Sequence, residues 1–386
     1  MFDLAKRQSD LGTETAFEVL AKAKELERTG KSIIHLEIGE PDFDTPKHIV
    51  DAAKKALDDG FTHYGPSAGQ MELRESIAKH QSQRQGYKVR PENIVVTPGA
   101  KPIMSFTIMA LIEKGVEAIY PNPGFPIYQS MIEYMGGKSI PMKLEENKGY
   151  NADIEGLESL ITDKTKLLII NSPNNPCGSV IPESDLEQIA NLAVKNDLIV
   201  LSDEIYKDMY YGDYDHVSIS KFPGMRERTI ILDGFSKSYA MTGWRLGYGV
   251  FPEFLVDEIT RIMTNINSCT NVFSQIAAIS ALEGSQESVN EMMKEFTVRR
   301  DLVVDGLNSL DGVTCQTPKG AFYAFPNITG TGMTSKEFEH AALYDAGVAL
   351  LSGTSFGKYG DGYVRVSFAN SRENLSEAIS RLKSIL

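Results

Sequence analysis

Short apolar runs alternate with segments of helical periodicity through the middle of the chain, and this alternation constrains the fold most. The apolar runs are Ile94–Thr97, Val116–Tyr120, Lys166–Ile170, Leu198–Ser202, Thr229–Leu232 and Leu246–Val250. The helical segments between them include Lys101–Leu111, Pro126–Met135 and Glu183–Val194. Strands that alternate with helices in this way predict an α/β fold with a mostly parallel sheet covered by helices. With a further strand over Ser139–Leu144, we expect a seven-stranded sheet.

The two ends of the chain show a different, mixed pattern. Residues 13–29 and Ser285–Leu310 have helical periodicity, and Ile33–Ile38 is a short strand. Further short elements are strands at Thr314–Gln316, Ala321–Pro326 and Val364–Phe368, and helices at Ser335–Tyr344 and Glu373–Ile385. A chain of 386 residues suits two domains. We therefore expect a large domain over residues 46–283 and a smaller α+β domain built from residues 1–45 and 284–386.

Composition and charge argue against several classes of partner. With 42% hydrophobic and 24% charged residues, the chain is typical of globular proteins. Its formal net charge of −13 disfavours nucleic acid and anionic membranes, because both select basic surfaces. Cys177, Cys269 and Cys315 are widely spaced and predict neither a zinc site nor a disulfide framework, so no metal is expected. No signal core or membrane-length apolar run is present, and we expect a reducing, cytoplasmic location.

Residues suited to chemistry follow the predicted strands directly. Gly99-Ala100-Lys101 comes after the strand that begins at Ile94, and Phe125 comes after the next. The later strands are followed by Asn175, by Asp203 and Tyr206, and by Lys237. In open α/β sheets, ligands bind beyond the carboxyl ends of the strands. The loops that carry these side chains are therefore predicted to meet at one edge of the sheet.

The most specific signal lies in one segment, Asp233-Gly234-Phe235-Ser236-Lys237-Ser238-Tyr239-Ala240-Met241-Thr242-Gly243-Trp244-Arg245-Leu246-Gly247. It presents one lysine among small and hydroxyl residues, and Arg245 stands eight residues later between two glycines. A desolvated lysine loses its proton readily and forms a Schiff base with a carbonyl compound. An arginine binds a phosphate through two parallel hydrogen bonds. Pyridoxal phosphate (PLP) offers both groups, whereas a lone Gly-x-x-Lys would indicate no more than an exposed turn.

This segment resembles the lysine-attachment motif of the class I/II aminotransferases, within the fold type I superfamily of PLP enzymes, and in particular the aspartate aminotransferases. The resemblance extends from Ile38 to Ala369. It implies a PLP-dependent transferase that moves the amino group of an L-amino acid to a 2-oxo acid such as 2-oxoglutarate by a ping-pong mechanism. Aspartate is the default donor in such a reading, with aromatic amino acids or alanine as alternatives. The resemblance also implies a homodimer with shared active sites.

The resemblance assigns roles toward the cofactor. The free N–H groups of Gly99 and Ala100, which begin a helix, suit a phosphate, and Lys101 adds charge. In the family an aromatic ring at the position of Phe125 stacks on the pyridine. Asn175, in Ser172-Pro173-Asn174-Asn175-Pro176-Cys177-Gly178, and Tyr206 are expected to contact the phenolic oxygen, although Cys177 stands where threonine is usual. Asp203 is expected to pair with the pyridinium N–H.

The remaining expectations concern the phosphate, the substrate and the partner subunit. The position of the usual phosphate-binding serine is Gly234 here, so Ser236 is expected to take over that role, with Arg245 as a second phosphate ligand. Tyr64 is expected to reach the cofactor phosphate of the neighbouring subunit. The expected substrate-binding residues are Gly39, Phe125, Asn175 and Arg365, and the expected catalytic residues are Lys237, Asp203 and Tyr206. Taken singly, several have plain structural interpretations: a helix cap at Gly99-Ala100, a core ring at Phe125, an N-cap at Asp203, a linker at Gly39, a solvated loop at Tyr64 and an exposed strand at Arg365.

Other functions leave weaker traces in the sequence. Gly353-Thr354-Ser355-Phe356-Gly357 matches the Gly-x-Ser-x-Gly elbow of serine hydrolases, but the following Lys358-Tyr359-Gly360-Asp361-Gly362 does not begin a helix. The dinucleotide and P-loop motifs are absent. A transcription regulator built on the PLP fold would carry an added DNA-binding segment, which this acidic chain has no spare length to provide. A PLP-dependent carbon–sulfur β-lyase would keep Lys237, Asp203 and Arg365 and is the main alternative.

Overall fold

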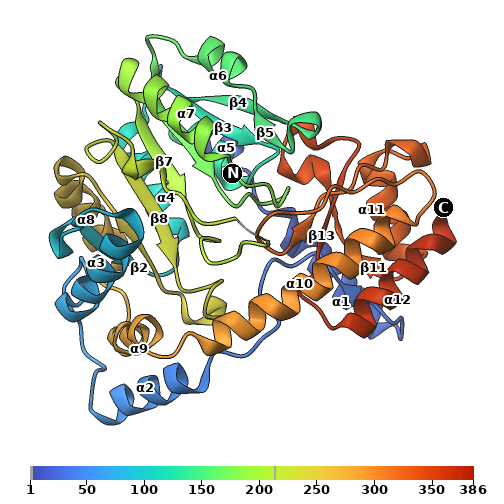
Figure 1. Cartoon of the computed structure of the whole chain (residues 1–386), viewed down its shortest axis with the longest axis horizontal. Helices are drawn as coiled ribbons and strands as arrows, with labels where there is room; N and C mark the ends of the chain where they lie inside the picture. The colour runs from blue at the N-terminus through green and yellow to red at the C-terminus, as the bar shows by residue number, and fades with distance from the viewer. Residues whose placement is uncertain (1–2, 213) are drawn as a thin grey trace.

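The computed structural model describes residues 3–212 and 214–386, which fold around an eight-stranded sheet (Figure 1). The strand order is β2-β9-β8-β7-β6-β3-β4-β5. The bounds are β2 Ile94–Thr97, β3 Glu117–Asn122, β4 Lys138–Glu145, β5 Asn151–Ala152, β6 Thr165–Asn171, β7 Ile199–Asp203, β8 Thr229–Gly234 and β9 Gly247–Val250. The expected α/β class with a mostly parallel sheet is confirmed.

Two strands depart from the parallel arrangement. β9 pairs antiparallel with both β2 and β8, and β5 pairs antiparallel with β4 at the edge of the sheet. The two-residue strand β5 is the eighth strand, beyond the seven that the sequence predicts. A pairing of two residues leaves no periodic pattern, so only the tertiary structure identifies it.

Helices cover both faces of the sheet, because successive strand residues point to opposite sides. Leu167, Ile169 and Leu201 pack on one face in a core shared with α4 (Lys101–Leu111), α5 (Ile127–Tyr134) and α8 (Glu253–Asn267). Leu168 and Ile170 face the other way, toward α7 (Glu183–Lys195). At the β2 end of the sheet, the face on the α7 side is covered by α2 (Lys47–Asp58), α3 (Met71–Gln85) and α9 (Val272–Glu283). The short α6 (Ile154–Leu160) contacts α7 and β4.

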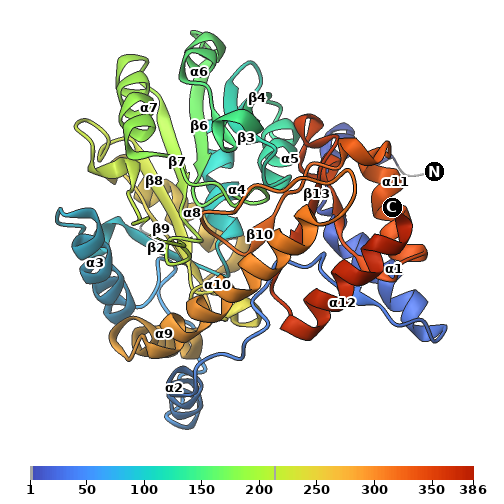
Figure 2. The same ribbon diagram turned by 45° about the vertical axis from the view of Figure 1, so that its right-hand side comes forward.

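A second group of elements combines both ends of the chain beside this sheet (Figures 1 and 2). It contains α1 (Thr15–Arg28), α11 (Ser335–Tyr344) and α12 (Arg372–Leu382). β1 (Ile34–His35) pairs with β11 (Val348–Ala349), and β13 (Val364–Ser367) pairs with both β10 (Tyr323–Ala324) and β12 (Leu351–Ser352). The long α10 (Glu287–Asn308) extends from α9 to this group and packs on α12.

One expected strand is wrong. Residues 314–316 form no strand, and only the isolated bridge between Thr314 and Asn327 is present there. Beyond the bridge, the backbone N–H and carbonyl of Cys315 bind the side chain of Asn308, so they are not available to extend a strand ladder. Across residues 3–212 and 214–386, no helix combines the length and the apolar character that crossing a membrane requires.

Candidate active site

The ends of β6, β7 and β8 create a cavity at the carboxyl edge of the sheet. The strand register aligns Asn171 with Asp203, and Asp203 with Leu232. The cavity has a volume of about 870 Å³, within the range of roughly 300–1,000 Å³ typical of ligand pockets. Its lining contains most of the residues predicted from the sequence, namely Gly39, Ala100, Lys101, Phe125, Asn175, Asp203, Tyr206, Ser236, Lys237, Arg245 and Arg365.

The amine of Lys237 lies in the lining of this cavity. Its Nζ donates a hydrogen bond to the carbonyl oxygen of Gly39 and lies 5.8 Å from the ring centre of Tyr206. Burial, and then the positive charge of Arg365, lower the pKa of Lys237 from 10.5 to about 8. A lysine with such a pKa supplies a useful fraction of free amine near neutral pH, as a nucleophile or a base requires.

Asp203 is held by neighbours that the sequence did not reveal. Its carboxylate accepts a hydrogen bond of 2.5 Å from the hydroxyl of Tyr128 and one of 3.2 Å from the backbone N–H of Ile205. The side chain of Asn171 donates to the backbone carbonyl of Asp203 at 3.0 Å. Burial raises the pKa of Asp203 to about 6, and the Tyr128 hydrogen bond opposes that rise. No cation pairs with this carboxylate among the described residues, so it suits a cationic N–H donor on a ligand.

The start of α4 and Arg245 lie against each other. Gly99 has φ +88°, and a Cβ at this position would lie 2.3 Å from Nη2 of Arg245. Arg245 itself has φ +53° and donates to the carbonyl of Thr242 at 2.8 Å. The glycine therefore allows the guanidinium to approach the free N–H groups at the start of the helix, and this juxtaposition suits a phosphate. Gly99 supports the cavity wall without lining it, whereas Ser236 lines the cavity.

Lys101 has a partner that was not expected. Its ammonium forms an ion pair with the carboxylate of Glu14, just before α1, and lies 5.4 Å from the ring centre of Phe125. The pair joins the N-terminal segment to the start of α4 beside the cavity. Any anion that binds Lys101 must therefore compete with Glu14. Phe125 lines the cavity and packs edge-on against Tyr128 at 5.7 Å between ring centres.

Arg365 is buried with part of its hydrogen-bonding capacity unused. Its guanidinium donates to Asn175 Oδ1 at 3.1 Å and to the carbonyl oxygen of Glu37, while Nε has no partner among the described residues. The rings of Tyr323 and Phe356 lie against it, at 4.5 and 4.9 Å from Cζ. Burial lowers the pKa of Arg365. A buried guanidinium without a carboxylate partner suits a carboxylate ligand.

Gly39 and Tyr323 meet in the lining of the cavity. A Cβ on Gly39 would lie 2.3 Å from the hydroxyl oxygen of Tyr323, so any side chain at this position would displace the Tyr323 hydroxyl. The Tyr323 hydroxyl in turn lies 2.9 Å from the hydroxyl of Tyr206. Tyr64 is absent from the cavity lining, and 90% of its surface is exposed. Within the described part of one chain it does not reach the site.

The functional residues that sequence reasoning missed are Tyr128, Asn171, Tyr323 and Glu14. Only Asn171, as the last residue of a strand, carried a signal that could have identified it. The other three act through contacts with residues distant in sequence.

Comparison with known proteins decides the family. The model of the family described as Aminotransferase class I and II matches residues 31–382. The chain belongs to this family. An aspartate aminotransferase of Pyrococcus abyssi is 45% identical over 359 residues, 92% of this chain and 92% of the relative. An aromatic-amino-acid aminotransferase of Thermococcus litoralis is 42% identical over 359 residues with the same coverage.

Solved structures of class I and II aminotransferases agree closely with this fold. The aspartate aminotransferase from Thermus thermophilus with maleate has a TM-score of 0.95 at 35% identity, and the match covers 100% of both chains. Members of the family are PLP-dependent, so PLP is the cofactor of this chain. The site fits that group, because it offers a buried amine, a buried carboxylate without a cation, and a helix start beside an arginine.

The hydrolase alternative fails on local structure. Ser355 lies in a 3-10 helix, Gly353–Phe356, that follows β12, and a second 3-10 helix, Lys358–Gly360, comes next. A nucleophile elbow requires a strand, a sharp turn and then an α-helix. The sequence match is therefore a chance one.

Proposed function

We propose that this aminotransferase takes the amino group from L-aspartate and passes it to 2-oxoglutarate, with aromatic amino acids as the second class of donor. The observation that carries the proposal is the placement of Lys237, Asp203 and Arg365 around one cavity. The names of the relatives support the choice of donors, since one is an aspartate and another an aromatic-amino-acid aminotransferase.

In this proposal each of the residues around the cavity contacts a different part of the cofactor. Asp203 accepts a hydrogen bond from the ring nitrogen, and Asn175 and Tyr206 contact the phenolic oxygen. Phe125 packs on the ring. The N–H groups at the start of α4, together with Ser236 and Arg245, bind the phosphate.

Lys237 and Arg365 act on the substrate. When bound, PLP supplies an aldehyde that takes up the amino group and a ring that accepts an electron pair. Lys237 removes the α-proton of the amino acid and later returns a proton, as base and then acid. Arg365 binds the α-carboxylate with both arms of its guanidinium, which fixes the direction of the Cα–H bond. Two alternating half-reactions give ping-pong kinetics.

Closure and dimerisation complete the proposal. We assign residues 46–283 to a large domain and residues 1–45 and 284–386 to a small one, so that Arg365 belongs to the small domain. Binding of a carboxylate at Arg365 then draws the two domains together over the cavity.

Tyr64 reaches the cofactor phosphate of the partner subunit in a homodimer, and its exposure in the single chain supports this role. The three free cysteines support a reducing cytoplasmic setting.

A donor panel tests the function. Aspartate, phenylalanine, tyrosine, alanine and a cysteine S-conjugate are each assayed with and without 2-oxoglutarate, and the 2-oxo acid formed from each donor and any ammonia are measured. We expect aspartate to have the highest kcat/KM and every turnover to require the acceptor. Release of ammonia and pyruvate from a cysteine conjugate without acceptor would instead favour the carbon–sulfur β-lyase.

A further inference from the structure

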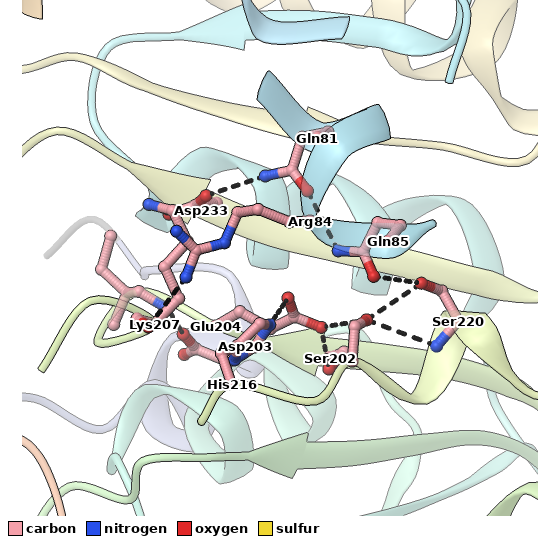
Figure 3. A network of polar contacts seen from close by, with 12 residues as sticks. Gln81, Arg84, Gln85, Ser202, Asp203, Glu204, Lys207, His216, Ser220 and Asp233 are labelled. Carbon is pink, nitrogen blue, oxygen red and sulfur yellow. Dashed lines mark hydrogen bonds and ion pairs between the residues drawn. The ribbon is translucent and has the colours of Figure 1, made fainter. Parts of the chain in front are cut away.

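A cluster of largely buried charges lies beside the catalytic loops, outside the lining of the cavity. Lys207 and Asp233 form an ion pair of 2.7 Å with 2% and 0% of their side chains exposed (Figure 3). Asp208 lies 3.3 Å from Lys207 and accepts a 2.5 Å bond from Arg84. None of these residues lines the cavity. The cluster contains two cations and two anions and is therefore close to neutral overall.

The cluster holds the lysine loop on both sides of Lys237. Asp233 precedes the loop, and its carboxylate binds Lys207, the side chain of Gln81 at 3.1 Å and the N–H of Gly234 at 2.7 Å. Ser238 follows Lys237 directly and donates its hydroxyl to Asp208 at 2.7 Å. The loop is thereby fixed at its start and immediately after the reactive residue.

The same cluster holds the second catalytic loop. Lys207 and Asp208 come directly after Tyr206, and that segment begins at Asp203. Arg84, near the end of α3, binds both the Asp208 carboxylate and, at 3.0 Å, the backbone carbonyl of Lys207. A helix of the outer layer therefore anchors the loop of Asp203 and Tyr206 to the loop of Lys237.

We infer that Arg84, Lys207, Asp208 and Ser238 are positioning residues that lock the two catalytic loops together and fix the direction of Lys237. The inference deepens the proposed function and rests on it. Stability alone is a poor reason for such a cluster, because buried ion pairs are often no more stabilising than apolar residues of the same size. A group that must attack and move protons gains from being held within a fraction of an ångström.

The charges themselves are strongly coupled, as a locking role requires. Burial alone would raise the pKa of Asp208, but Lys207 and Arg84 hold it well below its usual range. Burial likewise would lower the pKa of Lys207, and Asp208 and Asp233 raise it instead. Burial raises the pKa of Asp233, and its contacts with Lys207 and with the Tyr248 hydroxyl oppose that rise. The shifts of Asp208 and Lys207 therefore favour the charged forms of that pair, on which the contact with Ser238 depends.

Two serines provide a matched test. Ser238→Ala removes the hydroxyl that ties the lysine loop to Asp208. Ser220→Ala removes an equally buried hydroxyl from the far end of the same polar region, where it binds Gln85 at 3.0 Å and Ser218 at 2.9 Å (Figure 3). Each PLP-loaded variant is measured for kcat and KM with the best donor, for visible circular dichroism per bound cofactor, and for its thermal midpoint.

We expect Ser238→Ala to lose about tenfold in kcat with little change in KM, and to lose visible dichroism, because Lys237 is no longer held in one direction. Ser220→Ala keeps the wild-type kcat and visible dichroism, although its thermal midpoint falls. Ser238→Thr, which retains the hydroxyl, has the wild-type kcat and dichroism. If Ser238→Ala does not fold, Arg84→Gln is measured in its place, with the same expected loss.

Equal behaviour of Ser238→Ala and Ser220→Ala in kcat and dichroism would overturn the inference, as would wild-type values for Ser238→Ala. Its failure is distinguishable from that of the proposed function. A wild-type protein that transaminates normally beside an unaffected Ser238→Ala variant counts against the locking role alone. A wild-type protein that binds PLP but transfers no amino group counts against the proposed function, and the dichroism then still tests the loop.

Discussion

Burial shifts the pKa values of the two central ionisable groups of the site toward 7, that of Lys237 downward and that of Asp203 upward. The pKa of Lys237 falls to about 8, and that of Asp203 rises to about 6. In both cases the low polarity of the surroundings disfavours the charged form. A pKa near 8 suits Lys237 for the base and acid role proposed for it, whereas a pKa near 6 leaves Asp203 mostly ionised at neutral pH, as an acceptor for a cationic N–H requires.

The lowered pKa of Lys237 predicts how the apoprotein takes up its cofactor. The free amine is the reacting form, so the rate of PLP uptake should rise with pH and level off above about 8. The rate of uptake is measured by visible absorbance at a series of pH values from about 6 to about 10. In Arg365→Met the nearby positive charge is gone, so the plateau should move to higher pH. A rate that climbs through the whole range in the wild type would show an ordinary lysine.

The hydrogen bond from Tyr128 predicts a shift in the acid limb of activity. It stabilises ionised Asp203, so Tyr128→Phe should raise the pKa of Asp203 above about 6. The acid limb of the kcat profile should move upward by about one pH unit, the size expected for one hydrogen bond to a charge. Tyr120→Phe is the control, since the Tyr120 hydroxyl donates to Gln129 instead. An identical profile in both variants would show that Tyr128 does not support Asp203.

At the scale of the elements, the first turn of α4 is positioned by the close approach of β9. A Cβ on Gly247 would lie 2.6 Å from the backbone nitrogen of Ala100, whereas one on Gly243 would meet nothing within 4 Å. Both glycines flank Arg245 in the same motif. The glycine at position 247 therefore allows β9 to pack against the first turn of α4, where the phosphate is proposed to bind.

This pair of glycines gives a direct comparison. Gly247→Ala should displace the start of α4 and weaken PLP binding by about tenfold or more, as overpacking against backbone usually costs more than 1 kcal/mol. Gly243→Ala should bind PLP as the wild type does. Equilibrium titration of the two apoproteins provides the measurement, and equal affinities would mean that the β9 contact does not shape the phosphate site.

The elements also show why prediction from sequence succeeded where it did. Asn175, Asp203 and Lys237 were found because each follows a buried strand, and the ends of parallel strands meet at one edge whatever the rest of the chain does. Tyr128 and Tyr323 were not found, because their roles depend on contacts with Asp203 and Tyr206, 75 and 117 residues away in sequence. Such contacts leave no local pattern.

The same reasoning explains the errors in the smaller elements. β5, β11 and β12 each have two residues and were missed. β1 and β10 are equally short, but they lie within the longer stretches Ile33–Ile38 and Ala321–Pro326 that were expected as strands. The stretch Thr314–Gln316 has the composition of a strand but pairs through a single bridge. Lys101 was expected at the phosphate, and its ion pair with Glu14 depends on a contact between residues 87 positions apart in sequence.

At the scale of the whole molecule, the proposed sharing of each active site between two subunits depends on Tyr64. This side chain is 90% exposed in the single chain. Tyr64→Phe should weaken PLP binding by about tenfold through the loss of one hydrogen bond to a phosphate, while sedimentation still reports a dimer. Tyr214→Phe, at another exposed tyrosine, should change neither. Unchanged affinity in Tyr64→Phe would show that the partner subunit does not complete the site through this residue.

The function as a whole depends on Lys237 being the amine that holds PLP. Reduction of the PLP-loaded protein with borohydride fixes the cofactor to its lysine, and mass spectrometry of the digested chain then locates it. We predict that the added mass lies on the peptide that contains Lys237 and that Lys237→Ala takes up none. Attachment at any other lysine, or none at all in a yellow wild-type protein, would contradict the mechanism proposed for this site.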